Sequence, residues 1–241
     1  MGRRPTRLPA TRTVTDALVL RVVPYGEADA IVTYFTEELG KIAALGRGAR
    51  GSRRRFAGAL EPMHTHRITV EERQHRELAT LVESSLTVPR FRLVASLDGI
   101  EAAGQAMRWV RAGSPARTKE PSVWGELESL LDRLDASAPD PWALLAGTGL
   151  RLLMAFGYGL DFDACVRCGR VRPSEQSAYV AAAAGGVVCR ACGGARQKLD
   201  GALLGRLARA LRSEGELSAE DARIALPLVE EALAAHAGVE S

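Results

Sequence analysis

The chain has 241 residues, of which 46% are hydrophobic and 25% charged, so it is long enough to bury a core and is predicted to form more than one compact unit. Its longest weakly charged stretch, residues 141–160, is interrupted by four glycines and predicts a buried helix of about fifteen residues, whereas a membrane span needs about twenty. The net charge of +3 hides an asymmetry: residues 1–60 carry eleven Arg or Lys against five acids, a net +6, and the remainder is −3. This asymmetry is typical of a basic N-terminal module that meets a polyanion.

The first thirteen residues contain four Arg and no apolar run behind them. They therefore resemble neither a secretory nor a twin-Arg signal, and we expect a cytoplasmic protein without membrane association.

β-branched and aliphatic residues dominate the first 85 residues, which we predict to be one domain. The expected strands cover residues 13–23, 27–36, 41–45, 59–71 and 76–83. Five short strands with a long basic connection predict an oligonucleotide-binding (OB-fold) barrel. Three aromatic residues of this domain are candidates for stacking on bases: Tyr34, Phe35 and Phe56. For at least one of them, packing in the core is the alternative that we favour.

The basic connection follows the third expected strand and contains no acid between Gly40 and Phe56. Its glycines leave the backbone free to follow an irregular polyanion, and each Arg offers a planar donor fork to phosphate oxygens. The candidate DNA-binding residues are Lys41, Arg47, Arg50, Arg53, Arg54 and Arg55. The alternative is a solvated loop, because 29 of the 32 cations in this chain are Arg. The glycines at 46, 48 and 51 also match a dinucleotide-binding pattern, but they open onto an Arg run rather than a helix.

Residues 86–241 change to helical spacing and predict an α-helical domain. The expected helices cover residues 90–111, 123–134 and 142–156, and the third is apolar nearly all round, so we place it at the centre of the bundle. A further helix carries Leu203, Leu204, Leu207 and Leu211 on one face. The last one begins at Ser218, whose hydroxyl can form a capping pair with Asp221.

All four cysteines fall in two CxxC pairs, with twenty residues between the pairs: Cys165, Cys168, Cys189 and Cys192. This spacing is typical of a tetrahedral Zn²⁺ site, because each pair forms a tight knuckle that directs two sulfur atoms at one point. Two disulfides are the alternative, although a cytoplasmic chain keeps its thiols reduced. We therefore predict a structural zinc lobe over residues 162–198, inserted in the helical domain.

A four-thiolate site leaves no position for water or substrate, so we expect no enzymatic activity from the metal. His64 and His66 could form a metal-binding pair on a strand, but we predict that they are ordinary polar-face residues. The lobe also carries five arginines, which either are solvated or contact nucleic acid: Arg167, Arg170, Arg172, Arg190 and Arg196.

Several segments of the chain, in this order, resemble the RecO family of bacterial DNA repair proteins. They are the run from Pro24 to Val32, Gly40-Lys41, the Gly46–Arg54 loop, and the two CxxC pairs with Gly185-Gly186 between them. The resemblance implies an OB-fold barrel, a helical domain and a zinc lobe. It also implies a mediator of the RecF pathway that binds single- and double-stranded DNA and anneals complementary strands. The implied partners are RecR, single-stranded DNA-binding protein and, indirectly, the RecA recombinase, which the family helps to load onto coated strands.

Two further hypotheses belong to other classes: an RNA-binding zinc-containing OB-fold module, and a zinc-dependent enzyme, which the closed cysteine set opposes. For protein partners, Trp109 beside Arg108 and Arg111 is a hypothesis for an apolar groove that would take the acidic, aromatic-ended tail of single-stranded DNA-binding protein. Packing of Trp109 in the core is the alternative.

Overall fold

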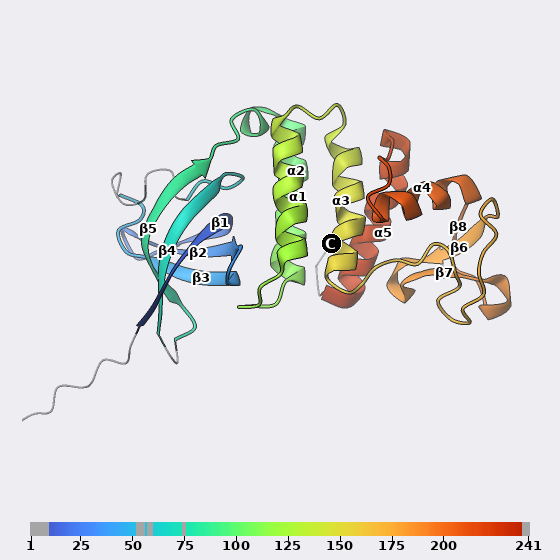
Figure 1. The fold of residues 1–241 in the computed structure, drawn as a ribbon, viewed down its shortest axis with the longest axis horizontal. Coiled ribbons are helices and arrows are strands. Elements are labelled where there is room, and N and C mark those ends of the chain that lie inside the picture. Colours follow the sequence, from blue (N-terminus) through green and yellow to red (C-terminus); the bar gives the residue numbers. More distant parts are fainter. Residues whose placement is uncertain (1–9, 52–55, 57–59, 74–75, 238–241) are drawn as a thin grey trace, which may run out of the picture. The chain divides into compact units, whose positions relative to one another are not determined.

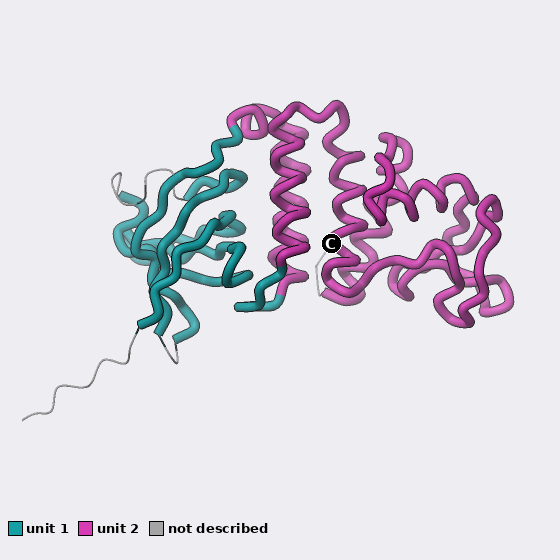
Figure 2. The backbone as a smooth tube through the Cα atoms, in the orientation of Figure 1, with its two compact units in different colours: residues 1–90, 115–120 teal, residues 91–114, 121–241 magenta. Residues whose placement is uncertain are grey.

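A computed structural model of the chain describes residues 10–51, 56, 60–73 and 76–237 (Figure 1). The chain divides into two units, one formed by residues 1–90 and 115–120 and the other by residues 91–114 and 121–241 (Figure 2). The first change of unit, after Arg90, lies five residues beyond the predicted boundary at 85/86. Within the described part of the chain, no helix combines the length and the apolar character that a bilayer crossing requires.

The first unit is a closed five-stranded barrel, the OB-fold that the sequence predicts. Its strands are β1 (Ala10–Tyr25), β2 (Asp29–Thr36), β3 (Gly40–Gly46), β4 (Thr65–Arg73) and β5 (Ala79–Val88). They follow one another round the barrel in the order β1-β2-β3-β5-β4, and β4 closes onto β1. All pairs are antiparallel except β3 with β5, which meet only at Ala44–Ala79 and Leu45–Thr80.

Alternation of side chains fills the barrel. In β2 and β3, every second residue is buried, so that Val32, Tyr34 and Ile42 join Phe56 in the core. Phe35 is also fully buried. The prediction that Tyr34, Phe35 and Phe56 stack on bases is therefore wrong, because none of the three rings reaches solvent. Burial also raises the pKa of the Tyr34 phenol.

β4 begins six residues later than the predicted residue 59, because the chain before it makes a turn around a buried arginine. The Arg90 backbone N–H donates to His64 Nδ1 (2.9 Å), and its guanidinium donates to the Met63 carbonyl and the Thr65 hydroxyl. His64 and His66 are 3% and 0% exposed. The prediction of polar-face histidines is thus wrong, since both rings are held inside.

A segment that joins two helices of the second unit, described below, belongs to the barrel unit. In this segment, residues 115–120, the Arg117 N–H donates to the Lys41 carbonyl (2.9 Å), and Thr118 lies against Gly40, whose φ is +64°. The side chains of Arg117 and Lys119 pair with Glu72 on β4 and with Glu38 beyond β2. The barrel is therefore completed by a segment far away in the sequence.

The second unit contains five α-helices: α1 (Leu97–Gly113), α2 (Pro121–Asp135), α3 (Pro141–Ala155), α4 (Gly201–Leu211) and α5 (Ala219–Ala237). α3 contacts the other four, which confirms its predicted central place. α1 begins at Leu97 with Ser96 as its N-cap, seven residues later than predicted, since a 3₁₀ turn, η1 (Leu93–Ala95), precedes it. Ser218 and Asp221 cap each other at the start of α5, as expected.

Trp109 on α1 is fully buried, and its ring contacts the backbone of α3 at Gly149, where an added Cβ would lie 2.8 Å from the ring. The prediction of a partner groove around Trp109 is wrong, because the indole is part of the helical core.

A small sheet is inserted between α3 and α4 (Figure 1). It comprises β6 (Ala178–Ala181), β7 (Gly186–Val188) and β8 (Gln197–Leu199), in the order β7-β6-β8, with the short turns η2 (Ala182–Ala184) and η3 (Arg190–Cys192). Together with the chain from Asp161 onward, these elements form the four-cysteine lobe.

Candidate metal centre and nucleic-acid interface

The four cysteines meet in the lobe, as their spacing predicts. Their sulfur atoms all lie within 4.8 Å of one another, and Cys168 Sγ is 3.7 Å from Cys189 Sγ. Each pair forms a knuckle: the Gly169 N–H donates to the Cys165 carbonyl (2.8 Å), and the Gly194 N–H donates to the Cys189 carbonyl (3.1 Å). Within the described ranges, this is the only group of three or more candidate metal ligands.

The thiols are free, and a disulfide would need sulfur atoms about 2.05 Å apart. Backbone hydrogen bonding from the Cys189 N–H to Cys165 Sγ (3.3 Å) lowers the pKa of Cys165 to about 6. Hydrogen bonds with the thiols of Cys189 and Cys168 raise the pKa of Cys192 to about 12. Four thiolates in one place repel one another, so full ionisation requires a cation between them. The donor set and its closeness fit a metal ion.

Side chains near the cluster hold the lobe's loops. The Arg167 guanidinium donates to the Cys192 carbonyl (2.7 Å) and so joins the two knuckles. Arg172 donates to the Phe162 carbonyl and to three carbonyls of residues 173–176. These two arginines therefore have structural roles within the lobe.

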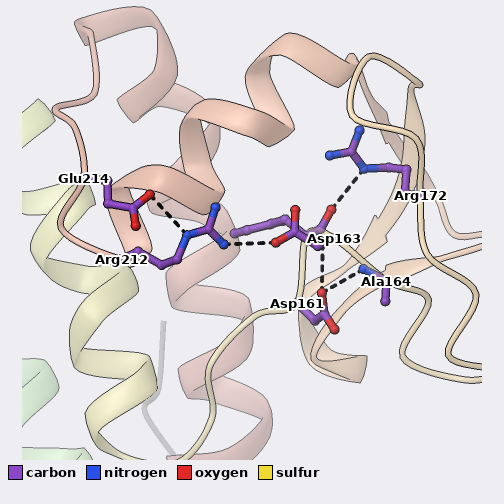
Figure 3. A network of polar contacts seen from close by, with 7 residues as sticks. Asp161, Asp163, Ala164, Arg172, Arg212 and Glu214 are labelled. Atoms are coloured by element: carbon purple, nitrogen blue, oxygen red, sulfur yellow. Dashed lines mark hydrogen bonds and ion pairs between the residues drawn. The ribbon is translucent and has the colours of Figure 1, made fainter.

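The lobe is tied to the end of α4 by a chain of polar contacts (Figure 3). Arg212 donates to Asp163 (3.0 Å) and also to Glu214 (3.4 Å). Two residues before Asp163, the Asp161 carboxylate accepts hydrogen bonds from the backbone N–H groups of Asp163 and Ala164 (2.8 and 2.9 Å). The strand-like entry into the first knuckle is thereby fixed before the cysteines begin.

The predicted DNA-binding residues are spread along one strand and the loop after it. Lys41 is half-buried at the start of β3, and Arg47 and Arg50 are exposed just after its end. Arg47 comes six positions after Lys41, a distance of about 20 Å at 3.3 Å per residue of strand. Arg53, Arg54 and Arg55 lie outside the described residues. The placed cations thus occupy the start of β3 and the loop beyond its end.

The loop after β3 is fixed to the tip of the β1–β2 hairpin. The Gly48 N–H donates to the Asp29 carboxylate (2.8 Å), and the Arg50 N–H donates to the Ala28 carbonyl (3.0 Å). The Arg50 guanidinium donates to the Glu27 carbonyl (3.3 Å). In OB-folds, the loop between the first two strands and the face of strands 2 and 3 are the parts that bind oligonucleotides. The Arg loop is therefore positioned beside a surface suited to a nucleic-acid strand.

Two residues of this surface escape the sequence reasoning. Tyr25 is 55% exposed at the hairpin tip, and Arg21 is exposed on β1 opposite Thr33 of β2. Tyr25 could have been found, because an aromatic residue between Pro24 and Gly26 sits at a turn, where its ring has little to pack against. It replaces the buried rings as the candidate for base contacts.

Comparison with known proteins gives matches along nearly the whole chain. Residues 11–90 match the family described as "Recombination protein O N terminal", and residues 97–240 match "Recombination protein O C terminal". Among curated relatives, the DNA repair protein RecO of Anaeromyxobacter sp. (strain K) is 39% identical over 75% of this chain and 70% of its own length. Those of Anaeromyxobacter dehalogenans (strain 2CP-C) and Geobacter metallireducens are 37% and 34% identical, over 95% and 93% of this chain and 87% and 92% of their own lengths.

Proposed function

This chain belongs to the RecO family of DNA repair and recombination proteins, and from that premise we propose that it binds single- and double-stranded DNA and anneals complementary strands. No bond is made or broken in this activity, so the protein is a mediator and not an enzyme. The single observation that carries the proposal is the Arg-rich loop, attached to the oligonucleotide-binding side of an OB-fold barrel.

The mechanism follows from electrostatics. Two DNA strands repel each other through their phosphates, and a cationic surface lowers this repulsion while base edges stay free to pair. Arg47 and Arg50 are exposed, and the Arg50 guanidinium contacts a neutral carbonyl oxygen, which does not cancel its charge. Tyr25 at the hairpin tip can stack on an unpaired base. The barrel would then hold a strand by its phosphates and present its bases.

We propose that the cysteine cluster holds one Zn²⁺ in a structural role, with Cys165, Cys168, Cys189 and Cys192 as its ligands. When bound, Zn²⁺ supplies the positive charge that the four thiolates need and stabilises the lobe. A set of soft sulfur donors favours Zn²⁺ over harder cations such as Mg²⁺ or Ca²⁺.

Family membership also supports a set of protein partners for this chain: RecR, single-stranded DNA-binding protein and, indirectly, RecA. In the proposed sequence of events, the protein acts on strands coated by single-stranded DNA-binding protein and, with RecR, helps to load RecA onto them.

Annealing of complementary oligonucleotides, bare or pre-coated with single-stranded DNA-binding protein, tests the proposal. We expect the purified chain to accelerate annealing of both substrates without a nucleotide cofactor. If it accelerates neither, the proposed function is wrong. If structured RNA displaces single-stranded DNA from the chain at equal concentration, RNA binding replaces it as the function.

A further inference from the structure

A pocket opens in the four-cysteine lobe, which belongs to the second unit. It has a volume of about 270 Å³ and is lined by residues 170–173 and 176–177, by parts of β6 and β7, by the start of η3 and by Lys198 of β8. None of its lining residues is Asp or Glu. Two of its lining residues, Cys165 and Cys189, belong to the proposed metal site. Apart from these thiols, the charged side chains of the lining are all cations, which suits the hollow to an anionic ligand.

The floor of the pocket is apolar and fixed. Tyr179 pairs with Val188 on one side and with Lys198 on the other, so these side chains form a row across the small sheet. The Tyr179 ring rests on the backbone of Gly194, where an added Cβ would lie 3.2 Å from the ring. Val171 stands at the mouth and is 74% exposed. A flat ligand could lie on this floor without rearranging it.

Three cations from separate segments surround this floor: Arg170 after the first knuckle, Arg190 in η3 and Lys198 in β8. All three are exposed, and their side chains make no hydrogen bond or ion pair with any other residue that the structure describes. The neighbouring Arg167 and Arg172 differ, because carbonyl oxygens hold their guanidinium groups. The charges of the three rim residues are therefore available to a ligand.

We propose that this pocket binds one unpaired nucleotide of single-stranded DNA, with the base on Tyr179 and Val171 and the adjacent phosphates on Arg170, Arg190 and Lys198. The inference rests on the proposed DNA-binding function and adds a second contact site to it. A nucleotide within a strand fits because it combines a base with flat apolar faces and two flanking phosphates, as the pocket combines an apolar floor with cations on its rim. A base inside a duplex is stacked and paired, so only an unpaired one can enter.

The test compares two triple variants of the full-length chain. One is Arg170→Ala, Arg190→Ala, Lys198→Ala. The matched control removes three exposed cations of the same unit that lie off the pocket: Arg196→Ala, Arg209→Ala, Arg223→Ala. Binding of oligothymidylate and of a duplex of equal length is followed by fluorescence anisotropy at several salt concentrations. For oligothymidylate, we expect the log–log salt slope to flatten by about 1.4 in the pocket variant, from roughly 0.7 for each of the two phosphates that flank the bound nucleotide, and to stay unchanged in the control. For the duplex, neither variant should change the slope.

A second variant tests the apolar contact at Val171 without removing a cation from the rim. Val171→Asp, at a position that is 74% exposed, should leave the bound metal content unchanged and weaken oligothymidylate binding on the order of tenfold. As a direct readout, an oligothymidylate containing 5-iodouracil should crosslink to Tyr179 on irradiation.

The outcomes separate this inference from the function on which it rests. If the wild-type chain binds no single-stranded DNA, both fail. If Arg47→Ala, Arg50→Ala weakens binding while the pocket variants bind like the wild type and crosslinks map only to the barrel, the pocket proposal alone is wrong. If the pocket variants instead lose affinity only for an acidic peptide, the pocket belongs to a protein partner and the proposal is overturned.

Discussion

Arg47 and Arg50 are the described arginines of the basic loop, and both are exposed beside the β1–β2 hairpin. If each neutralises one phosphate of a single strand, replacing both with Ala should flatten the log–log salt slope of binding by about 1.4. Fluorescence anisotropy of a labelled oligothymidylate measures this slope between about 50 and 200 mM salt. Over this roughly fourfold range of salt concentration, phosphate contacts dominate the change in affinity.

Arg67 and Arg117 supply the control for this prediction. Both lie on the same barrel, but Arg67 makes two hydrogen bonds to the Asp16 carboxylate (2.7 and 2.9 Å) and Arg117 pairs with Glu72. Their charge is already balanced, so Arg67→Ala, Arg117→Ala should leave the slope nearly unchanged. Equal slopes for the two double variants would show that the DNA does not follow the loop after β3.

Because of His66, the free energy of unfolding of the barrel should depend on pH. Its ring is fully buried and forms a hydrogen bond with the Glu61 carbonyl (2.9 Å); burial lowers its pKa below the ordinary 6.5. Below pH 6.5 the unfolded chain takes up a proton that the folded protein resists, so the free energy of unfolding should fall as the pH drops, by at most about 1.4 kcal/mol per pH unit. Above pH 6.5, this histidine should not change the free energy of unfolding as the pH varies.

Urea unfolding at pH 8.0, 7.0, 6.0 and 5.5 tests this expectation about the barrel. The free energy of unfolding should begin to fall near the ordinary histidine pKa of about 6.5. The His66→Gln variant keeps a donor near the Glu61 carbonyl but does not titrate, so its stability should vary less between pH 7 and 5.5. A variant that loses stability as steeply as the wild type would contradict the assignment to His66.

At the scale of elements, substitution of two glycines measures how much the contact of residues 115–120 with the barrel contributes to stability. Gly40 and Gly48 both have left-handed backbones, with φ of +64° and +66°. An added Cβ at Gly40 would lie 1.8 Å from the Thr118 carbonyl oxygen, whereas Gly48 has nothing within 4 Å. We expect Gly48→Ala to cost about 1 kcal/mol from backbone strain alone and Gly40→Ala about 3 kcal/mol or more, because the segment must also detach.

Urea denaturation of both variants measures the difference, and hydrogen exchange of residues 115–120 locates it. In Gly40→Ala, but not in Gly48→Ala, the Arg117 N–H should lose its protection, since its partner is the Lys41 carbonyl. Equal losses of stability would mean that the segment does not depend on this contact.

Among the elements, the four-cysteine lobe should depend most on the proposed metal ion. Its strands have only four, three and three residues, and such a sheet does not persist without further support. Chelation should therefore remove hydrogen-exchange protection from residues 162–199 while α1, α3 and the barrel keep theirs, because their cores contain no cysteine.

A Cys165→Ser variant provides an independent check on metal removal, because it deletes one of the four clustered ligands without a chelator. It should reproduce the same local loss. Protection that stays unchanged in the lobe under both treatments would show that the protein part is stable by itself.

The elements also show where sequence reasoning succeeds and where it stops. Apolar alternation and helical spacing predict the five strands and α1 to α5, because both patterns are local. The cysteine spacing predicts the cysteine cluster for the same reason: each knuckle is formed within six consecutive residues. The short β3–β5 pairing and the return of residues 115–120 to the barrel involve distant segments, and no local pattern indicates them. For the same reason, the sequence does not indicate the burial of His66 and leaves Trp109 open between a groove and the core, since the partners of both lie on other elements.

At the scale of the whole molecule, the two units divide the proposed work. The barrel carries an excess of positive charge that lies in its loop after β3, and the helical unit carries the lobe whose rim cations are also exposed. Two cationic sites on one chain could hold a strand at two points, which raises the effective concentration at the second site once the first is bound. Variants in both sites should then lose more single-strand affinity than either set of substitutions alone.

If charge neutralisation is the mechanism, annealing must respond to salt as steeply as binding does. Six phosphate contacts per strand give a log–log slope of about −4, so a fourfold rise in salt should lower single-strand affinity roughly 300-fold. Annealing of bare oligonucleotides at subsaturating protein, followed by the quenching of a fluorophore pair, should lose its acceleration over the same range. Hybridisation without protein becomes faster with salt, because counterions screen the phosphates, so the two curves should converge. An acceleration that survives the rise in salt would mean that stacking or protein contacts, and not the arginines of the barrel, bring the strands together.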